Sequence, residues 1–267
     1  MKINKDTKLI FSIAERPGNF GTTFFNRAFA CLELDYIYKA LRLSPDGDLD
    51  AVIRAIRALG IAGCSVTMPF KERVLPLLDR LDPQAKKIGA VNTIVNTDGV
   101  LTGYNTDFSG VLNVVRENLD VRGKTALVCG LGGVAKAVVP ALQELGATVF
   151  VTGRDEKKLK SFLQTVSAEG FPWHDLEKAK GFLFVNATSV GMAPAEETSI
   201  VSTSTLKNFE AVLDVVGQPS ETKLIQTAKS LGLKTVTGGQ MVVEQAVCQF
   251  QLYTGQKFPR EILNKIL

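Results

Sequence analysis

The stretch that decides the fold reads Cys129-Gly130-Leu131-Gly132-Gly133-Val134-Ala135-Lys136-Ala137. The apolar residues 126–129 predict a buried parallel strand, and residues 134–145 predict the helix that follows. Gly130 permits a tight turn, and Gly132 lets the backbone approach a phosphate closely. Gly133 opens the helix, whose N-terminal amides and dipole favour an anion. This order of strand, turn and helix predicts a dinucleotide site in which Gly130, Gly132, Gly133 and Val134 surround the pyrophosphate.

A whole domain has room to precede this turn in a chain of 267 residues. Residues 8–104 alternate short apolar segments with helical ones, and Asp98-Gly99 between two apolar segments predicts a β-hairpin. A helix over 107–119 leads into a second region where strands and helices alternate, as in a parallel, doubly wound sheet. The expected strands are 9–13, 36–41, 61–66, 91–95, 100–104, 125–129, 148–152, 181–185, 211–216 and 234–236.

We therefore predict an α/β fold with two domains. The first is an N-terminal α/β substrate domain over residues 1–106, completed by about 240–267, because the helical stretch 239–253 is expected to return to it. The second is a Rossmann-type dinucleotide-binding domain over residues 107–239.

Composition is ordinary for a globular protein, with 45% apolar and 22% charged residues. A net charge of +4 with scattered basic residues does not fit a nucleic-acid binder. No apolar run reaches the roughly 18 residues of a membrane span, and the N-terminus lacks a signal-peptide core. No Cys/His spacing fits a metal site. We expect a cytoplasmic protein with a small-molecule substrate and no nucleic-acid or membrane partner, either a monomer or a homodimer.

Three polar segments stand at predicted strand ends: residues 65–71, 89–93 and 103–108. Pro69 suits the first turn of a helix, which would place Lys71 in that turn, although Lys71 is equally compatible with a plain surface lysine. Asp107 is compatible with a simple helix cap. The chain has one histidine, His174, in an expected loop, so any acid/base group is expected to be Lys, Asp, Glu or Tyr.

Taken together, these segments resemble the shikimate dehydrogenase family over nearly the whole chain. The matching motifs are Val66-Thr67-Met68-Pro69-Phe70-Lys71, Gly89-Ala90-Val91-Asn92-Thr93, Asn105-Thr106-Asp107, Asn186-Ala187-Thr188-Ser189-Val190-Gly191-Met192 and Gly239-Gln240-Met241 with Gln245. The resemblance implies an oxidoreductase of aromatic amino acid biosynthesis. Its reaction would be the NADP-dependent, reversible oxidation of shikimate to 3-dehydroshikimate, or of a closely related cyclic hydroxy acid.

The resemblance also implies roles for individual residues. Lys71 and Asp107 match the catalytic pair, in which Lys71 takes or gives the hydroxyl proton and Asp107 holds Lys71 and the ring hydroxyls. Thr67, Asn92 and Gln245 match positions that hydrogen-bond the polyol. On the cofactor side the matching residues are Arg154, Thr188, Ser189, Met192 and Gly239, with the nicotinamide along the last two.

Cofactor choice is expected to depend on Thr152-Gly153-Arg154-Asp155. Arg154 matches the family's arginine, which stacks on adenine and meets the 2′-phosphate of NADP. Gly153 and Asp155 depart from the family's Asn-Arg-Thr pattern, and Asp155 is compatible with accepting a 2′-hydroxyl of NAD or with repelling a phosphate. We predict NADP, with NAD also possible.

Other departures concern the substrate carboxylate. The family opens with a Ser-x-Ser pair that binds it, whereas this chain keeps Ser12 and has Ala14 instead of the second serine. Losing one hydrogen bond to a charged group costs about 1.5–3 kcal/mol, and Arg16 or Thr22 are the expected replacements. Ser65 and Gly217 also depart from the family pattern, as in its divergent shikimate dehydrogenase-like branch.

Three alternatives stay open at this point. One is a quinate/shikimate dehydrogenase that uses NAD. Another is a non-catalytic, nucleotide-binding regulatory protein, which the intact Lys71 and Asp107 argue against. The third, a dehydrogenase of folate one-carbon units, shares the two-domain plan but is disfavoured by the Asn-Thr-Asp and Asn-Ala-Thr-Ser segments.

Overall fold

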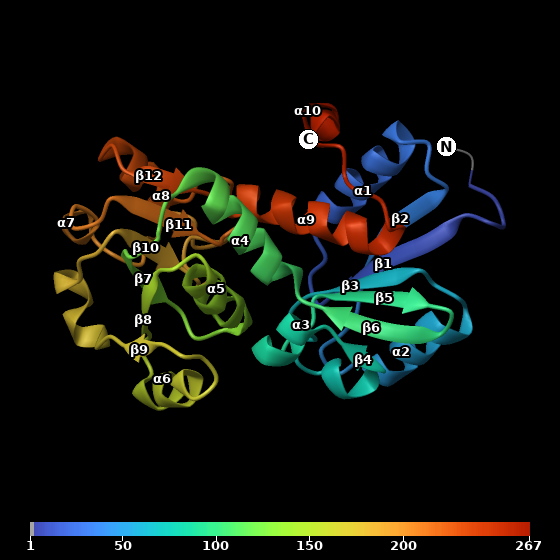
Figure 1. Cartoon of the computed structure of the whole chain (residues 1–267), viewed down its shortest axis with the longest axis horizontal. Helices are drawn as coiled ribbons and strands as arrows, with labels where there is room; N and C mark the ends of the chain where they lie inside the picture. The colour runs from blue at the N-terminus through green and yellow to red at the C-terminus, as the bar shows by residue number, and fades with distance from the viewer. Residues whose placement is uncertain (1–2) are drawn as a thin grey trace. The chain divides into compact units, whose positions relative to one another are not determined.

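A computed structural model describes residues 3–267 of the chain, which divides into two compact units (Figure 1). The first unit ends at Thr106 and resumes at Ala246, and the second is Asp107–Gln245. The chain therefore passes between the units twice, once in helix α4 (Thr106–Asn118) and once in helix α9 (Gly238–Thr254).

The first unit contains one mixed sheet. Its strands follow the order β2-β1-β3-β5-β6-β4, in which β1 is parallel to β2 and β3, and β5 is antiparallel to β3 and β6. Strands β5 and β6 form the predicted hairpin. Asp98 and Gly99 make its turn, and both have positive φ. The elements are β1 Lys8–Ala14, α1 Phe20–Cys31, β2 Tyr36–Arg42, α2 Leu49–Ala58, β3 Gly63–Val66, η1 Leu75–Leu77, β4 Arg80–Leu81, α3 Pro83–Ile88, β5 Thr93–Thr97, β6 Val100–Tyr104, η3 Arg260–Ile262 and α10 Leu263–Ile266.

Two different cores flank this sheet. Helix α2 presents Leu49, Ile53 and Ile56 to a mainly aliphatic core that includes buried residues of β1, β3, β5 and β6. Helix α1 contributes to an aromatic cluster, in which Phe25 stacks on Tyr38 at 4.6 Å and Phe24 on Phe258 at 5.6 Å. Phe24 and Phe25 are each 1% exposed, so this helix is held by aromatic packing.

The second unit contains one parallel sheet, in the order β12-β11-β10-β7-β8-β9. Strand order reverses at β7, where the doubly wound fold places a ligand at the carboxyl ends of the strands. The predicted Rossmann-type sheet is confirmed. Beside α4 and α9, the elements are β7 Thr125–Cys129, α5 Gly133–Glu144, β8 Thr148–Thr152, α6 Glu156–Leu163, β9 Glu169–Gly170, η2 Trp173–Lys178, β10 Leu183–Asn186, α7 Thr203–Leu206, β11 Ala211–Asp214, α8 Lys223–Ser230 and β12 Lys234–Val236.

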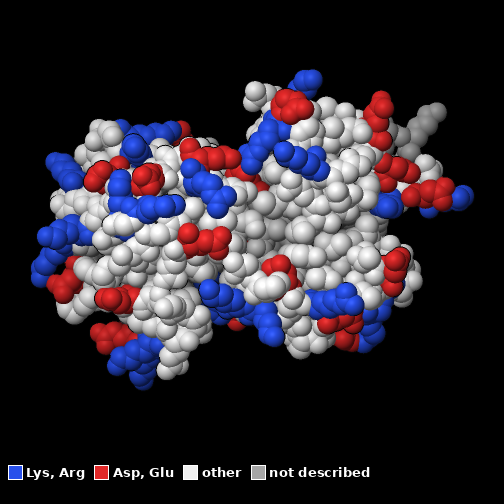
Figure 2. Space-filling view, in the orientation of Figure 1, with Lys and Arg blue, Asp and Glu red and all other residues white. Residues whose placement is uncertain are grey.

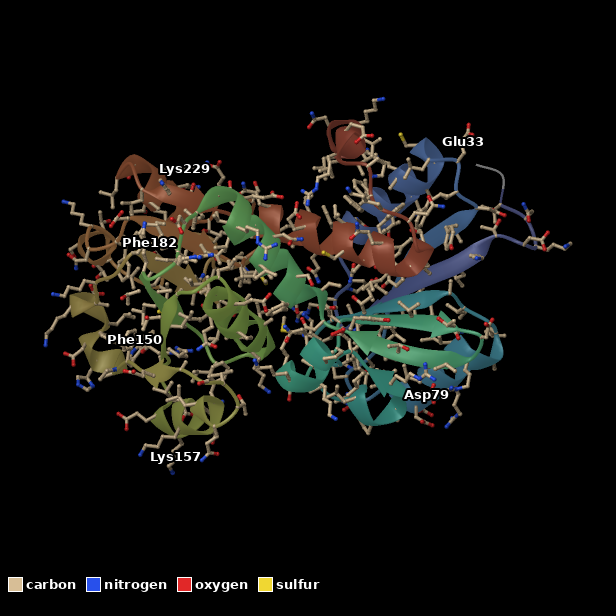
Figure 3. All side chains as sticks on the ribbon, in the orientation of Figure 1. Glu33, Asp79, Phe150, Lys157, Phe182 and Lys229 are labelled. Atoms are coloured by element: carbon tan, nitrogen blue, oxygen red, sulfur yellow. The ribbon has the colours of Figure 1, made fainter. Side chains whose placement is uncertain are left out.

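The second unit has its own apolar core. One cluster of buried residues includes Phe184, Leu206 and Ile225, and the partly buried Phe150 of β8 packs against it (Figure 3). At Gly110 in α4, an added Cβ would lie 3.1 Å from the carbonyl oxygen of Met241 in α9, so glycine permits the close approach of these two helices. None of the helices within residues 3–267 combines the length and apolarity needed to span a bilayer.

One expectation needs correction. Lys71 does not lie in the first turn of a helix, because residues 68–74 form turns and a bend. Tertiary hydrogen bonds take the backbone groups there: the Thr67 amide donates to Ile13, and the Lys71 carbonyl accepts from Val91 at 2.8 Å.

Candidate functional site

Three chain segments meet at one edge of the first sheet, where β1 and β3 end and β5 begins. The Val66 amide donates to the carbonyl of Asn92 at 2.8 Å, and the Asn92 amide donates to the carbonyl of Tyr104 at 3.0 Å. The segments predicted from the sequence to carry the substrate chemistry, 65–71, 89–93 and 103–106, are therefore adjacent in this unit.

Asn92 organises this edge and is 1% exposed. Its Oδ1 accepts three hydrogen bonds, from the Thr106 amide (2.8 Å), the Thr106 hydroxyl (3.1 Å) and the Thr93 hydroxyl (2.9 Å). Gln249 of α9 donates to the Thr93 hydroxyl at 2.9 Å, which fixes the end of α9 on the same network. The Asn92 Nδ2 is a buried donor without an acceptor among residues 3–267, and such an unpaired group costs about 1–3 kcal/mol in general.

Lys71 and Asp107 border this network through their neighbours in the chain. The Lys71 backbone is hydrogen-bonded to Val91, next to Asn92, and the residue is half-buried. Asp107 follows Thr106, is 3% exposed, and lies in the first turn of α4. A carboxylate there is favoured by the helix dipole, so Asp107 is inside the helix and does not act as the cap that precedes it.

The first serine of the opening segment has a protein partner. Ser12 pairs with Ser65 across β1 and β3 and hydrogen-bonds to the Tyr38 hydroxyl. The Tyr38 hydroxyl also donates to Ser65 at 3.1 Å, and Ser65 lies 2.8 Å from the Tyr253 hydroxyl. Burial raises the pKa of Tyr38 to about 12 and that of Tyr253 well above 10, so both phenols remain neutral at ordinary pH. Ser65 thus completes a partly buried chain of hydroxyl groups.

The other residues expected to contact the substrate differ in their surroundings. Arg16 is exposed in the loop after β1, and Thr67 is exposed just after β3. The Thr22 hydroxyl accepts from the Ala40 amide at 3.3 Å, which connects α1 to β2. Gln245 is half-buried in α9, in the second unit, and its backbone faces Gly110.

The glycine turn of the second unit has the geometry that its sequence predicts. Gly130 has φ +136°, and an added Cβ would lie 2.5 Å from the carbonyl oxygen of Ala187. Gly132 precedes the first residue of α5, Gly133, and an added Cβ at either position meets nothing within 4 Å. Val134 is half-buried in the first turn. Open space before free helix amides fits a pyrophosphate group.

A cavity of about 370 Å³ lies beside this turn, entirely within the second unit. It reaches from Gly130 to the end of β8 and is bordered by the predicted cofactor residues Arg154, Thr188 and Ser189. Asn186 shapes the 188–190 segment: its Oδ1 accepts from the Thr188 amide and hydroxyl, and its Nδ2 donates to Val190. Met192 follows this segment and is 39% exposed. Gly239 lies in the first turn of α9 and is half-buried.

Two departures at the end of β8 have structural explanations. An added Cβ at Gly153 would lie 2.5 Å from the side chain of Leu131. Leu131 of the glycine turn therefore fills the space that the Cβ of the family's asparagine would need. Asp155 is the N-cap of α6, and its carboxylate accepts from the Lys158 amide at 3.0 Å. Capping gives Asp155 a role that does not involve the cofactor.

Sequence reasoning missed several residues that border this cavity. Leu131, Lys158, Trp173, Ser199 and Ile200 all line it. The bulky Leu131 within a glycine turn, together with Gly153 in place of a larger residue, was a signal for that pair. Trp173 lies some 20 residues after β8, in a segment that returns to the carboxyl end of that strand. Nothing in the local sequence pattern around Trp173 indicated this.

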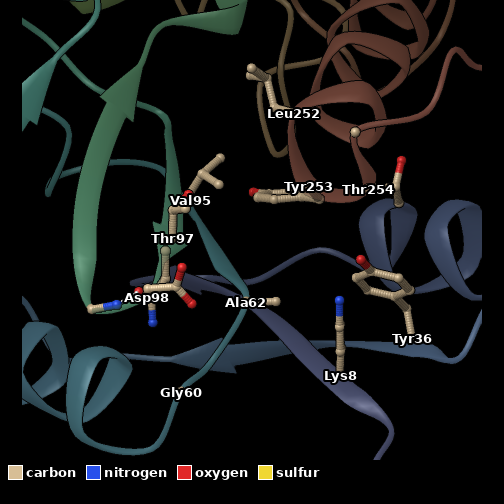
Figure 4. A pocket seen from close by; sticks show the side chains of 13 residues that line it. Lys8, Tyr36, Gly60, Ala62, Val95, Thr97, Asp98, Leu252, Tyr253 and Thr254 are labelled. Carbon is tan, nitrogen blue, oxygen red and sulfur yellow. Dashed lines mark hydrogen bonds between the residues drawn. The ribbon is translucent and has the colours of Figure 1, made fainter.

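The first unit has another cavity, of about 440 Å³, near the amino ends of β1 and β2 (Figure 4). Lys8 and Asp98 at its rim are exposed. Asn96 uses its side chain within the fold, donating to Ile56 and Ile61 and accepting from Gly99. No residue predicted as part of the substrate site lines this cavity, so it does not belong to the candidate site.

A Rossmann-type unit with a glycine turn, joined to a second α/β unit with a polar strand-end cluster, defines the class of two-domain dinucleotide-binding proteins. The sequence profile of the shikimate dehydrogenase substrate binding domain matches residues 21–94. The shikimate dehydrogenase-like protein of Haemophilus influenzae is 38% identical over 98% of this chain and 96% of its own. The shikimate dehydrogenase (NADP(+)) of Alkaliphilus metalliredigens is 35% identical over 91% and 89%.

Solved structures agree with these relatives. The shikimate 5-dehydrogenase of Thermus thermophilus, determined in complex with NADP(H) and shikimate, superimposes with a TM-score of 0.87. It is 28% identical, and the match covers 97% of this chain and 100% of that one. The chain belongs to the shikimate dehydrogenase family, as its motifs predict.

Proposed function

We propose that this protein catalyses the NADP-dependent, reversible oxidation of shikimate to 3-dehydroshikimate, or of a closely related cyclic hydroxy acid. The first unit, with the end of α9, binds the substrate and the second binds the cofactor. The observation that carries the proposal is the backbone hydrogen bond from the Val91 amide to the Lys71 carbonyl. It joins the segment of Lys71 to the segment of Asn92, whose buried Nδ2 has no acceptor within residues 3–267, and so supports a shared role for the two residues. Membership of the family and the bound ligands of the Thermus thermophilus relative support it.

Lys71 is the proton acceptor in the oxidation and the donor in reverse. The substrate hydroxyl loses its proton as its carbon loses a hydride, and the nicotinamide supplies the hydride chemistry when bound. A positioned side chain that moves such a proton contributes about 10²–10⁴-fold. Asp107 holds the Lys71 ammonium and a ring hydroxyl, and its burial limits the water that competes for both.

Asn92 holds a ring hydroxyl through Nδ2, with Thr67 and Gln245 as further partners. The Asn92 Oδ1 is occupied by three donors, so the side chain cannot rotate to present oxygen without losing all of them. Because Nδ2 is shielded from solvent, an acceptor reaches it only when the side chains around it shift. Asn92 therefore selects a hydrogen-bond acceptor. The carboxylate is held by Arg16 or Thr22 together with Ser12.

The cofactor is NADP. The glycine turn receives the pyrophosphate, and Arg154 with Lys158 supplies positive charge beside the end of β8, where the 2′-phosphate is expected. Thr188 and Ser189 border the same cavity as Arg154, and the nicotinamide lies along Met192 and Gly239. The Asp155 carboxylate repels a phosphate less than a free carboxylate would, because it accepts a hydrogen bond from the Lys158 amide as the N-cap of α6. NAD is a weaker alternative.

We further propose that the protein acts in the cytoplasm as a monomer or a homodimer and binds no nucleic acid. Acidic and basic side chains are interspersed on the face shown in Figure 2, without an extended basic patch. This distribution supports the view that its partners are small molecules.

Steady-state turnover of shikimate and quinate with NADP and NAD tests the function. Lys71→Met keeps the approximate length of the side chain but removes its ionisable amine, and it is expected to lower kcat by at least about 100-fold. Lys87→Met, at an exposed position of α3, is the matched control and should leave kcat and the melting temperature unchanged. Near-wild-type turnover by the Lys71 variant would remove the lysine from proton transfer. A wild-type protein that turns over neither acid with either cofactor would overturn the function.

A further inference from the structure

Trp173 is the only tryptophan of the chain, and it borders the cavity beside the glycine turn. It is the first residue of η2, half-buried, and packs against the apolar core below β10 and β11 together with Ile200. One part of the indole is therefore fixed by the core, while another part faces the cavity.

The cavity around Trp173 has the chemistry of a purine site. Leu131 and Ile200 are apolar, and Arg154 adds a planar guanidinium group. Adenine is a planar aromatic base, and such bases bind by stacking on aromatic side chains and on arginine. The location agrees, because the end of the second Rossmann strand, here β8 with Gly153, contacts the adenosine half of a dinucleotide.

We propose that Trp173 forms a wall of the adenine site and contacts the base of the bound cofactor. This rests on the proposed use of an adenine dinucleotide and adds a residue that the family motifs do not indicate. The lining also explains how Gly153 is tolerated: Leu131 fills the space next to it, so an apolar surface continues from the glycine turn to the indole.

Because the chain has a single tryptophan, its fluorescence reports on this site alone. Titration with NADP, or with 2′,5′-ADP, is expected to quench the indole with the dissociation constant found by calorimetry. Nicotinamide mononucleotide, which lacks adenine, should cause no quenching. Trp173→Ala should weaken 2′,5′-ADP binding by roughly tenfold and raise the KM for NADP equally, with kcat unchanged, as expected for one base stack. Trp173→Phe should retain most of the affinity.

Phe171→Ala is the matched control. Phe171 packs against the same core but does not line the cavity, so its loss should lower the melting temperature without changing nucleotide affinity. Calorimetric binding of 2′,5′-ADP without quenching, or equal affinities of the Trp173→Ala and Phe171→Ala variants, would overturn the role of Trp173 and leave the dehydrogenase function standing. If the wild-type protein binds neither nucleotide by calorimetry, the proposed NADP chemistry fails as well.

Discussion

Two asparagines at strand ends, one in each unit, look alike in the sequence and differ in the fold. Asn92 precedes β5 and Asn186 ends β10; both are 1% exposed. Asn92 accepts three hydrogen bonds and has a donor left over. Asn186 has both ends satisfied, because its Oδ1 accepts twice and its Nδ2 donates to Val190 and to Asp214, each at 3.0 Å.

Under the proposed function, the difference separates a residue that recognises a ligand from one that builds the fold. Buried polar groups in native proteins are nearly always paired, so an unpaired donor at a strand-end cluster indicates a missing acceptor. Asn186 has no capacity left for a ligand and instead fixes the segment that carries Thr188 and Ser189. The same isosteric change, from amide to carboxylate, should therefore affect stability at one position and catalysis at the other.

The largest effect is expected from Asn186→Asp. The new carboxylate oxygen would face two acceptors, the carbonyl of Val190 and the carboxylate of Asp214. Burial already raises the pKa of Asp214, although the Thr222 hydroxyl, the Val216 amide and Asn186 donate to it. A second buried carboxylate beside it should lower the free energy of unfolding by about 3 kcal/mol or more at neutral pH.

The sign of the pH dependence follows from the raised pKa. Carboxyl groups whose pKa is higher in the folded protein stabilise it at low pH, and this stabilisation is lost as the pH rises above their ordinary value of about 4. The difference in melting temperature between Asn186→Asp and the wild type should thus grow from about pH 4 to about pH 8. A constant difference would mean that the two carboxyl groups do not share a site.

Asn92→Asp should have a smaller energetic effect, and on a different quantity. The substitution keeps the oxygen that accepts from Thr93 and Thr106 and replaces the orphaned donor with a second carboxylate oxygen. We expect kcat/KM for shikimate to fall about 100-fold, which corresponds to about 2.7 kcal/mol. The melting temperature should fall less than in Asn186→Asp, because three donors already face the carboxylate. Retained kcat/KM would show that Nδ2 does not contact the substrate and would erase the contrast with Asn186.

The sequence could predict the parts of the fold that local patterns determine. The strand, glycine turn and helix around Gly130 and the Asp98-Gly99 hairpin are of this kind, because glycine and turn residues specify their own backbone conformations. The turn at Lys71 was predicted wrongly, since its backbone bonds to β1 and to Val91, which are distant in sequence. The position of Trp173 and the contact between Leu131 and Gly153 are also set by tertiary packing, which no local spacing encodes.

The smallest effect concerns Thr152, whose hydroxyl is the other buried side-chain polar atom without a partner in residues 3–267. Thr152 ends β8 with no exposed surface, and it does not line the adjoining cavity. Its hydroxyl therefore represents a cost to the fold without a ligand to offset it. Thr152→Val replaces the hydroxyl with a methyl group of similar size and should raise the free energy of unfolding by about 1 kcal/mol.

The KM for NADP should stay within about twofold of the wild type in this variant, in contrast to the loss of catalysis expected for Asn92→Asp. Thermal unfolding and steady-state kinetics check both parts. A destabilised Thr152→Val protein would mean that the hydroxyl has a partner in solution, such as a buried water. A raised KM with unchanged stability would instead place Thr152 in the cofactor site. Either result would show that an orphaned polar atom alone does not distinguish a binding edge from a core position, and that the distinction requires the surrounding strand-end cluster.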